Sequence, residues 1–466
     1  MKRSNLVHIG NLGRRNWPYV VTWIIYYAWV IVFTTWWTAS PITDEVYSTD
    51  IRAMLHSINL LASAFFVVIM KKDWFVRFSK IGAICVSVSA VLFLTVTSPA
   101  LHLAVIVLLG VSLGIVNAGI LMPFVFALNN TEKFYAVMGT NLLISVLVLL
   151  QETQVLNITN GMLPSLVMLF LGLAPLHWFH RSDLDAAAPV QTHTAPKTKK
   201  ILYVTIILNC LYAVLCKGIG RMFVLAADGR VPFNLNVVFY LGAIAGCGVY
   251  FLIYALFRHG NLITWNVTFG AFVIAMVVHM AGQSSAPAAV ALAVLLGIGS
   301  TMGMINMYYI LGVIGKKYQS QTYVKVSVVF IGCVGGITGV LLGKWGTNYP
   351  DSIAIAVAAI SSVVIVLLLM LSPTLSRTYF NEGWAEDSQK PEVDNEWAYL
   401  FAQYDLSKRE IEVCRMLLEG YTLRQTAARL GIAYPTANTY QTSLYRKLGI
   451  NSKTELLLHF KDYLTK

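Results

Sequence analysis

The sequence has little charge for its length. Of its 466 residues, only 12% are Asp, Glu, Lys or Arg, while 57% are hydrophobic. A typical soluble domain carries about 25% charged residues, and disordered chains are poor in hydrophobic ones. The composition therefore excludes an ordinary soluble enzyme and an intrinsically disordered chain. Long uncharged apolar stretches instead place most of the chain in a lipid bilayer, as an integral membrane protein.

Cysteine is also scarce, and its spacing does not resemble that of a metal site. There are six cysteines, and no two of them are spaced as Cys-x-x-Cys. Five lie in apolar segments, where a free cysteine packs as a small hydrophobic side chain. The sequence also has no recognisable nucleophile–base pair, metal cluster or phosphate-binding loop. We therefore expect no cofactor, no metal and no enzymatic activity.

Twelve apolar segments are long enough to cross a membrane, each being close to the ~20 residues that span the hydrocarbon core. The longest polar connection within the body, residues 181–200, is a predicted central loop between a first half over 1–180 and a second half over 201–372. The predicted spans are 17–39, 51–70, 79–97, 101–128, 134–153, 162–180, 201–225, 234–257, 262–282, 287–315, 322–343 and 352–371.

The basic residues of the short loops predict the orientation of these spans. Eighteen lysines and arginines lie on the side of the N-terminus and five on the other side. Loops rich in lysine and arginine stay in the cytoplasm. We therefore expect a multi-pass membrane protein with the N-terminus and the C-terminal domain both cytoplasmic.

Two sets of six spans, cytoplasmic termini and a basic central loop resemble the major facilitator superfamily. The resemblance covers residues 1–372 and rests on architecture. In that family the loop between spans two and three usually reads G-x-x-x-D-R-x-G-R-R, whereas residues 71–80 here read KKDWFVRFSK, without the glycines. The predicted spans also lack the deep carboxylate that proton-coupled transport usually needs. Both departures weigh against active transport.

Polar and aromatic side chains within the spans are candidates for a ligand site. Lys217 and Arg221 lie four residues apart on one face of the seventh span, where they could bind an anionic or phenolic ligand. The alternative is that both side chains reach up to the outer membrane surface. The resemblance to the major facilitators implies that spans one, four, seven and ten line a central cavity. The candidates on these spans are Tyr26, Trp29, Asn117, Lys217, Arg221, Asn306 and Tyr309, of which the asparagines could instead hydrogen-bond between helices.

The chain changes character near its C-terminal end. Residues 373–405 hold seven acidic and two basic residues and indicate a linker, whereas residues 406–466 hold ten basic and five acidic residues, a net charge of +5. Helix-start signals and a proline in a first turn predict a compact four-helix domain that contains a helix-turn-helix. These signals are Ser407-x-x-Glu410, Thr422-x-x-Gln425, Pro435 and Ser452-x-x-Glu455.

The segment from Leu406 to Leu456 resembles the LuxR-type DNA-binding domain. It reads LSKREIEVCRMLLEGYTLRQTAARLGIAYPTANTYQTSLYRKLGINSKTEL. The family pattern runs L-[ST]-x-R-E-x-E-V-L-x-L-L-x-x-G-x-[ST]-N-K-E-I-A-x-x-L-x-I-S-x-x-T-V-K-x-H-x-x-x-I-x-x-K-L, and the match has no gap. The matching residues include Leu406, Arg409, Glu410, Glu412, Val413, Leu417, Leu418, Gly420, Thr422, Ala427, Leu430, Ile432, Thr436, Lys447 and Leu448.

The sequence departs from the family pattern at positions that touch DNA. Where the family has T-V-K-x-H, residues 436–440 read TANTY, without the usual lysine and histidine. Asn438 could still pair bidentately with an adenine, while basic side chains would contact phosphates. The alternative is a domain that has become a protein adaptor. The predicted DNA-binding residues are Arg424, Thr436, Asn438, Thr439, Gln441, Thr442, Tyr445, Arg446 and Lys447.

Together these features predict an all-α protein with two parts. A polytopic membrane bundle of twelve transmembrane helices, six plus six and major-facilitator-like, is followed by a four-helix LuxR-type helix-turn-helix domain. The expected function is that of a membrane-bound one-component transcription regulator, whose body senses a small molecule and controls binding to a pseudo-palindromic site on double-stranded DNA. The resemblance implies a protein of the bacterial inner membrane and a homodimer through the C-terminal domain. The alternative is a major-facilitator-type transporter with an autoregulatory DNA-binding tail.

Overall fold

In the computed structural model every regular element among the described residues is a helix, and these residues contain no strand. The chain forms two compact units, Met1–Asp387 and Ser388–Lys466. Residues 181–196 of the predicted central loop and 379–403 of the predicted linker lie outside the described residues. The described residues are 12–13, 15–36, 51–71, 74–155, 162–180, 197–227, 231–257, 260–282, 285–317, 321–346, 348–378, 404, 406–418 and 420–460.

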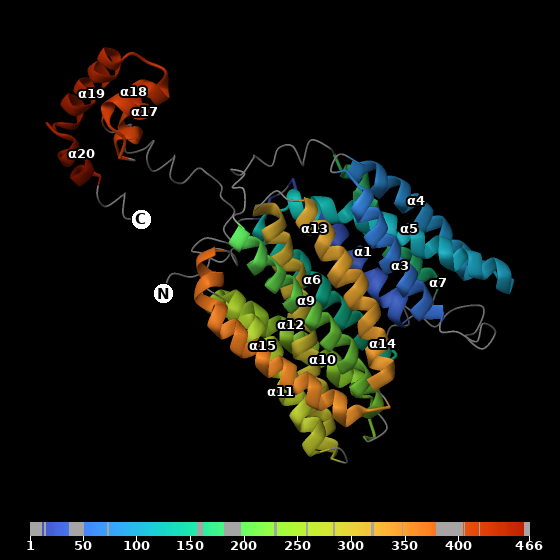
Figure 1. Ribbon diagram of the computed structural model, residues 1–466. Coiled ribbons are helices and arrows are strands. Elements are labelled where there is room, and N and C mark those ends of the chain that lie inside the picture. The colour runs from blue at the N-terminus through green and yellow to red at the C-terminus, as the bar shows by residue number, and fades with distance from the viewer. Residues whose placement is uncertain are drawn as a thin grey trace. The chain divides into compact units, whose positions relative to one another are not determined.

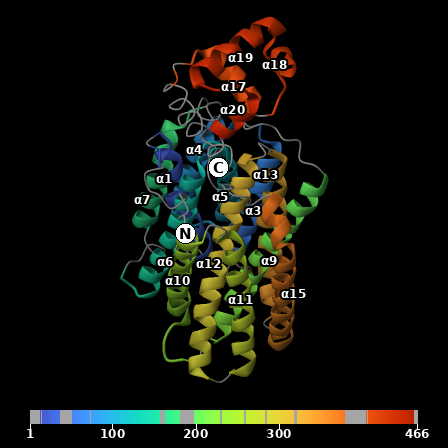
Figure 2. The same cartoon turned by 90° about the vertical axis from the view of Figure 1, so that its left-hand side faces the viewer.

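The first unit is a bundle of apolar helices that pack side by side (Figures 1 and 2). Within lipid a helix satisfies all backbone hydrogen bonds inside one segment, so apolar runs of this length become helices. The helices are α1 (Trp17–Trp36), α3 (Ile51–Ile69), α4 (Phe75–Thr95), α5 (Pro99–Phe126), α6 (Asn130–Glu152), α7 (Met162–Leu173), α9 (Lys197–Ala227), α10 (Leu235–Leu256), α11 (Gly260–Ala281), α12 (Ala286–Lys317), α13 (Gln321–Ser327), α14 (Gly336–Gly346) and α15 (Pro350–Thr378).

Eleven helical segments among the described residues are long and apolar enough to cross a membrane, and they coincide with eleven of the predicted spans. The sixth predicted span, 162–180, is shorter, because α7 passes into the 3-10 helix η4 (Ala174–Trp178). Pro175 explains this change, since proline lacks a backbone N–H and its ring obstructs an α-helix. The eleventh span is continuous but irregular, with the π-helical stretch η6 (Val328–Gly335) between α13 and α14.

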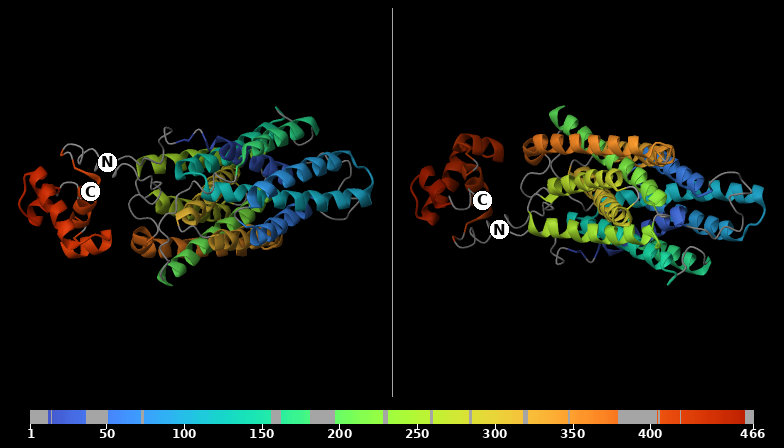
Figure 3. Two further views of the ribbon diagram at one scale, coloured as in Figure 1. Left: turned by 90° about the horizontal axis from the view of Figure 1, so that it is seen from above. Right: turned by 90° about the horizontal axis from the view of Figure 1, so that it is seen from below.

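The two halves of the bundle repeat one pattern of helix contacts. In the first half α1 contacts α6 and α7, while α5 contacts α3 and α4. In the second half α9 contacts α14 and α15, while α12 contacts α10 and α11. Across the halves, α6 contacts α10 and α12, and α3 contacts η6. Figure 3 shows the helices of the first half, coloured blue to teal, beside those of the second, coloured green to orange.

Glycines set the distance between α10 and α12. A Cβ at Gly242 would meet the backbone of Val294, and a Cβ at Gly297 would meet the backbone carbonyl oxygen of Phe239. Small residues of this kind allow helix backbones to approach closely in a membrane. By contrast, a Cβ at Gly248, also on α10, would meet nothing within 4 Å.

The second unit contains α17 (Lys408–Leu418), α18 (Leu423–Leu430), α19 (Tyr434–Leu448) and α20 (Lys453–His459) around a small core of its own. All three predicted helix-start signals are confirmed. Ser407 and Glu410 bond each other's backbone N–H, as do Thr422 and Gln425, and the Ser452 hydroxyl accepts from the backbone N–H of Glu455. Glycines with positive φ end α18 and α19 at Gly431 and Gly449.

Two glycine substitutions on α10 test the packing of α10 against α12. We expect Gly242→Ala to lower the stability of the detergent-solubilised protein by about 1–3 kcal/mol, because the added methyl forces the two backbones apart. Gly248→Ala adds the same methyl where there is space and should leave stability unchanged or raise it by up to about 1 kcal/mol. Thermal melts of both variants measure the difference, and equal changes in melting temperature would contradict this account of the packing.

Candidate nucleic-acid interface and internal cavity

The helix-turn-helix of the second unit is formed by α18 and α19. The turn between them runs through Gly431, whose left-handed conformation (φ 63°) lets the chain reverse direction at no steric cost. Thr426 and Ala427 of α18 and Ala437 of α19 are buried on the facing sides of the two helices. Burial of these faces leaves the opposite face of α19 to the solvent.

The exposed face of α19 carries polar side chains at helical spacing. Asn438, Thr442 and Arg446 are all exposed and lie four residues apart, so they form one stripe along the helix. Beside this stripe, the Gln441 amide donates to the Tyr445 hydroxyl at 2.7 Å, and both side chains are half-buried. The structure therefore brings five of the predicted DNA-binding residues onto one accessible surface.

The remaining predicted residues around this surface differ in their surroundings. Arg424 on α18 and Thr436 in the first turn of α19 are exposed. The Thr439 hydroxyl donates to the backbone carbonyl of Pro435 at 3.0 Å, which ties it to its own helix. Lys447 lies at the edge of the surface, and its amine points toward α17.

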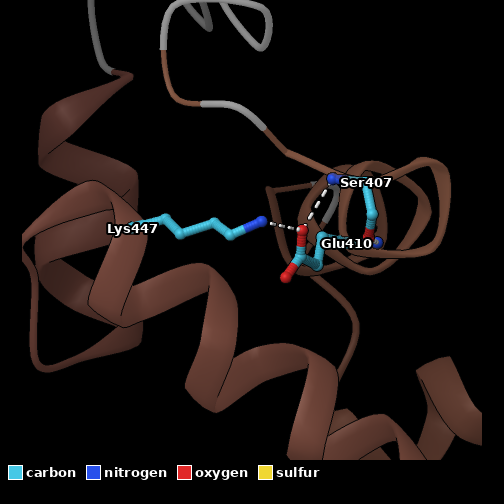
Figure 4. A network of polar contacts seen from close by, with 3 residues as sticks. All are labelled: Ser407, Glu410 and Lys447. Carbon is cyan, nitrogen blue, oxygen red and sulfur yellow. Dashed lines mark hydrogen bonds and ion pairs between the residues drawn. The ribbon is translucent and has the colours of Figure 1, made fainter.

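Lys447 is engaged by a buried carboxylate. Its Nζ donates to Oε2 of Glu410 at 2.9 Å, and the same oxygen accepts from the backbone N–H of Ser407 at 2.6 Å (Figure 4). Burial alone would raise the pKa of Glu410, but hydrogen bonds from Ser443, Lys447 and Ser407 outweigh it and lower this pKa to about 2. The pair joins α17 to α19 and fixes the orientation of the exposed helix.

A cavity of about 120 Å³ lies inside the first unit, among helices of both halves. Lys217 and Arg221 of α9 line it, together with residues of α1, α6, α10 and α12. Arg221 Nη1 donates to the hydroxyl of Tyr240, another lining residue, at 3.2 Å. The two cations predicted from the sequence therefore line one internal space, which we call the cationic cavity.

The structure does not bring the predicted asparagines into the cationic cavity. Asn117 lines a second cavity, of about 130 Å³, and its amide donates to Asn59 and Ser63 of α3 at 2.9 Å each. Asn306 is fully buried, and its Oδ1 accepts from the hydroxyls of Tyr250 and Thr264. Both asparagines thus take part in hydrogen bonds between helices.

The predicted aromatic residues also lie outside the lining of the cationic cavity. Tyr26 donates to the backbone carbonyl of Leu113 at 3.5 Å, and Trp29 donates to the Ser165 hydroxyl at 3.1 Å. Tyr309 is fully buried and packs edge-on against Phe134 and Tyr254. These three side chains are packed between helices.

Other aromatic residues line the cavity instead, namely Trp23 and Tyr27 of α1, Phe239 and Tyr240 of α10 and Tyr308 of α12. Trp23, Tyr27 and Tyr308 lie on spans that were expected to line a cavity, but the predicted site residues did not include them. Trp23 stacks on Phe124 with ring centroids 3.6 Å apart, and the Tyr27 and Tyr308 centroids are 6.5 Å apart. The i, i+4 spacing of Trp23 and Tyr27, which puts both on one helix face, was the available signal.

Comparisons with known proteins identify a different relationship for each unit. Residues 405–460 match the GerE family, described as bacterial regulatory proteins of the luxR family. The body is similar in structure to the human organic anion transporter MFSD10 (TETRAN), with a TM-score of 0.52 and 13% identity over 76% of this chain and 96% of the transporter. It is also similar to a bacterial homologue of the iron transporter ferroportin, with a TM-score of 0.51 and 11% identity over 78% of this chain and 98% of that one. No curated protein matches the chain in sequence.

The second unit thus carries a LuxR-type helix-turn-helix domain, and the first has a fold like that of major facilitator transporters. At these identities the structural likeness concerns the fold alone. The chain joins a body of transporter-like architecture to a DNA-binding domain of a regulator family.

Replacement of Glu410 by glutamine tests the contact between α17 and α19. The pKa of Glu410 is about 2 when folded and about 4.3 in an unfolded chain, so its ionised form contributes roughly 3 kcal/mol at neutral pH. Because folding lowers this pKa, the contribution is complete above about pH 5 and is lost as the pH falls toward 2. We expect Glu410→Gln to destabilise the second unit at pH 7 and to lose that difference in acid, as followed by denaturant unfolding of residues 388–466.

The matched control is Glu412→Gln on the same helix. Glu412 is 45% exposed in its side chain and pairs with Arg409 at the surface, so its removal should cost well below about 1 kcal/mol. If both variants lose the same free energy of unfolding, the buried contact of Glu410 stabilises the domain no more than the exposed ion pair of Glu412, which would contradict this account.

Proposed function

We propose that the protein is a membrane-bound one-component transcription regulator. The observation that carries this proposal is the LuxR-type match over residues 405–460, combined with an exposed, polar and basic face on α19. In this function the body binds a small molecule within the inner membrane, and the C-terminal domain binds double-stranded DNA in the cytoplasm. The excess of basic residues in the loops on the N-terminal side supports this orientation.

The exposed face of α19 can both read and position DNA. Asn438 has the amide geometry that pairs bidentately with an adenine in the major groove, and Gln441 has the same chemistry beside it. Arg446 and Arg424 are exposed and suit contacts with phosphates, which fix the register of the helix on the duplex. Lys447 contributes through Glu410, by holding α19 in place.

A homodimer through the C-terminal domain fits a pseudo-palindromic operator, because two-fold symmetry of the protein matches two-fold symmetry of the site. Leu458 supports this arrangement, since it lies on α20 with 63% of its surface exposed. An exposed leucine on the helix that commonly pairs in this family suits a contact with a second copy.

Sensing suits the body better than proton-coupled transport does. The acidic residues in its described helices, Glu132, Glu152 and Asp351, all lie in a first or last turn. Proton-coupled transport usually needs a carboxylate deep in the bundle. A ligand bound inside the body would act by stabilising one arrangement of its helices over another.

The test is to crosslink the full-length protein to DNA in its native cells, recover it and sequence the attached fragments. We expect enrichment at one or a few promoters that contain a repeated half-site. Asn438→Ala should reduce this enrichment strongly, because the loss of a bidentate base contact costs about 1–3 kcal/mol. Asn451→Ala, an exposed asparagine in the turn before α20, is the matched control and should bind as the wild type does.

A flat profile for the wild-type protein would contradict the regulator function. Uptake or efflux that depends on the protein would then favour the alternative, a transporter that carries the DNA-binding domain as a regulatory tail.

A second prediction separates phosphate contacts from base contacts. We expect Arg446→Ala to weaken binding to all sequences alike and to reduce the slope of log K against log [salt] by about one, because one phosphate contact is lost. Titrations of the recovered operator at several salt concentrations measure that slope. Asn438→Ala should leave the slope unchanged, and the opposite pattern would reverse the two assignments.

A further inference from the structure

Two cationic side chains line the cationic cavity. Lys217 and Arg221 both line it, whereas the described residues around it include no aspartate or glutamate. Charged groups withdrawn from water are costly unless an opposite charge or hydrogen bonds compensate them. Arg221 donates to the hydroxyl of Tyr240, and Lys217, one helical turn away on the same face of α9, brings a second positive charge to the same space. The cavity therefore has the electrostatics of a site for an anion.

Ser300 of α12 supplies a second, independent indication. It lines the same cavity and is 2% exposed, and its Oγ has no hydrogen-bond partner among the described residues. Serines elsewhere in the body, such as Ser112, donate back to their own helix. A buried hydroxyl left without a partner costs free energy, so a ligand oxygen that accepts from Ser300 would be favoured.

The volume and walls of the cavity limit the rest of the ligand. Its volume is about 120 Å³, and a protein cavity of about 150 Å³ is known to hold benzene. Trp23, Tyr27 and Tyr308 present aromatic rings to this space. The enclosed part of a ligand is therefore no larger than one small ring, and because the cavity is partly open, the remainder of the ligand can lie in its mouth.

We propose that the cationic cavity binds a compact organic monoanion, a carboxylate attached to a single ring. The carboxylate lies between Lys217 and Arg221 and accepts from the Ser300 hydroxyl, while the ring packs against the aromatic walls. The proposal rests on the proposed function, because it takes this cavity as the sensing site.

The position of the cavity explains how such a ligand would act on the body. The lining comes from α1 and α6 of the first half and from α9, α10 and α12 of the second. An anion held between the halves binds most tightly when both are drawn around it. It therefore favours one arrangement of the halves, which is the unequal binding that sensing requires.

Direct binding to the purified full-length protein tests the proposal, with radiolabelled benzoate as the probe in equilibrium dialysis. Benzamide, which has the same shape without the charge, and acetate, which has the charge without the ring, are the competitors. We expect benzoate to bind at least about tenfold more tightly than either. Charge-assisted hydrogen bonds of this kind change affinity by about that factor or more.

Three variants, at Lys217, Arg221 and Ser300, test whether these side chains bind benzoate, and two further variants serve as controls. Lys217→Gln and Arg221→Gln should each weaken benzoate binding about tenfold and remove the preference over benzamide. Lys80→Gln and Arg77→Gln make the same changes at exposed positions of α4 and should bind as the wild type does. Ser300→Ala should weaken benzoate binding about threefold without lowering the melting temperature, because the hydroxyl that it removes has no partner.

Three results would overturn the proposal: no benzoate binding, benzamide binding as tightly as benzoate, or unchanged binding in the Lys217 and Ser300 variants. These outcomes are distinct from failure of the regulator function, because the dialysis needs no DNA. Benzoate binding without promoter enrichment would leave the site standing and remove the regulator. Promoter enrichment without benzoate binding would support the regulator function and contradict the proposed site.

Discussion

Polar groups within the membrane body must find partners inside the protein, and much of its structure follows from this requirement. It makes every described membrane segment a helix, because a helix pairs its own backbone groups. It also draws polar side chains together across helices, as when Asn306 accepts from Tyr250 and Asn117 donates to Asn59. Ser300, whose buried hydroxyl lines the cationic cavity without a partner among the described residues, is one of the places where the requirement is not met from within.

The helices of the body could be predicted because length and apolar composition are local properties of the chain. The residues that line a cavity could not, because neighbours on a helix point about 100° apart, and the surrounding helices decide which one faces inward. The tyrosine pair Tyr308 and Tyr309 illustrates this. Both tyrosines were candidates for the cavity and Tyr309 was the predicted site residue, yet Tyr309 is packed between helices and Tyr308 lines both cavities. Lys217 and Arg221 were recognisable because charge is rare in such a segment.

The C-terminal domain was more open to prediction, since α17, α18 and α20 each begin with a capping signal written within four residues, and α19 has Pro435 in its first turn. These local patterns do not reveal which polar side chains are already bonded to residues far away in the sequence. Lys447 illustrates this, because its partner Glu410 is 37 residues earlier in the chain. A lysine near the end of a recognition helix suggests a phosphate contact, but here it also braces that helix against α17.

The two cavities of the body share two lining residues, Tyr27 and Tyr308, and α12 contributes further residues to both, whereas α6, α9 and α10 line only the first and α3, α5 and η6 line only the second. A molecule that displaces Tyr308 gains room in one cavity at the expense of the other. Occupancy of the first is thereby thermodynamically linked to the packing of α3 and η6, which touch only the second. Tyr27 and Tyr308 separate the two cavities. A change in the position of their side chains would therefore transmit the effect of a ligand in the first cavity to α3 and η6, which that ligand does not contact.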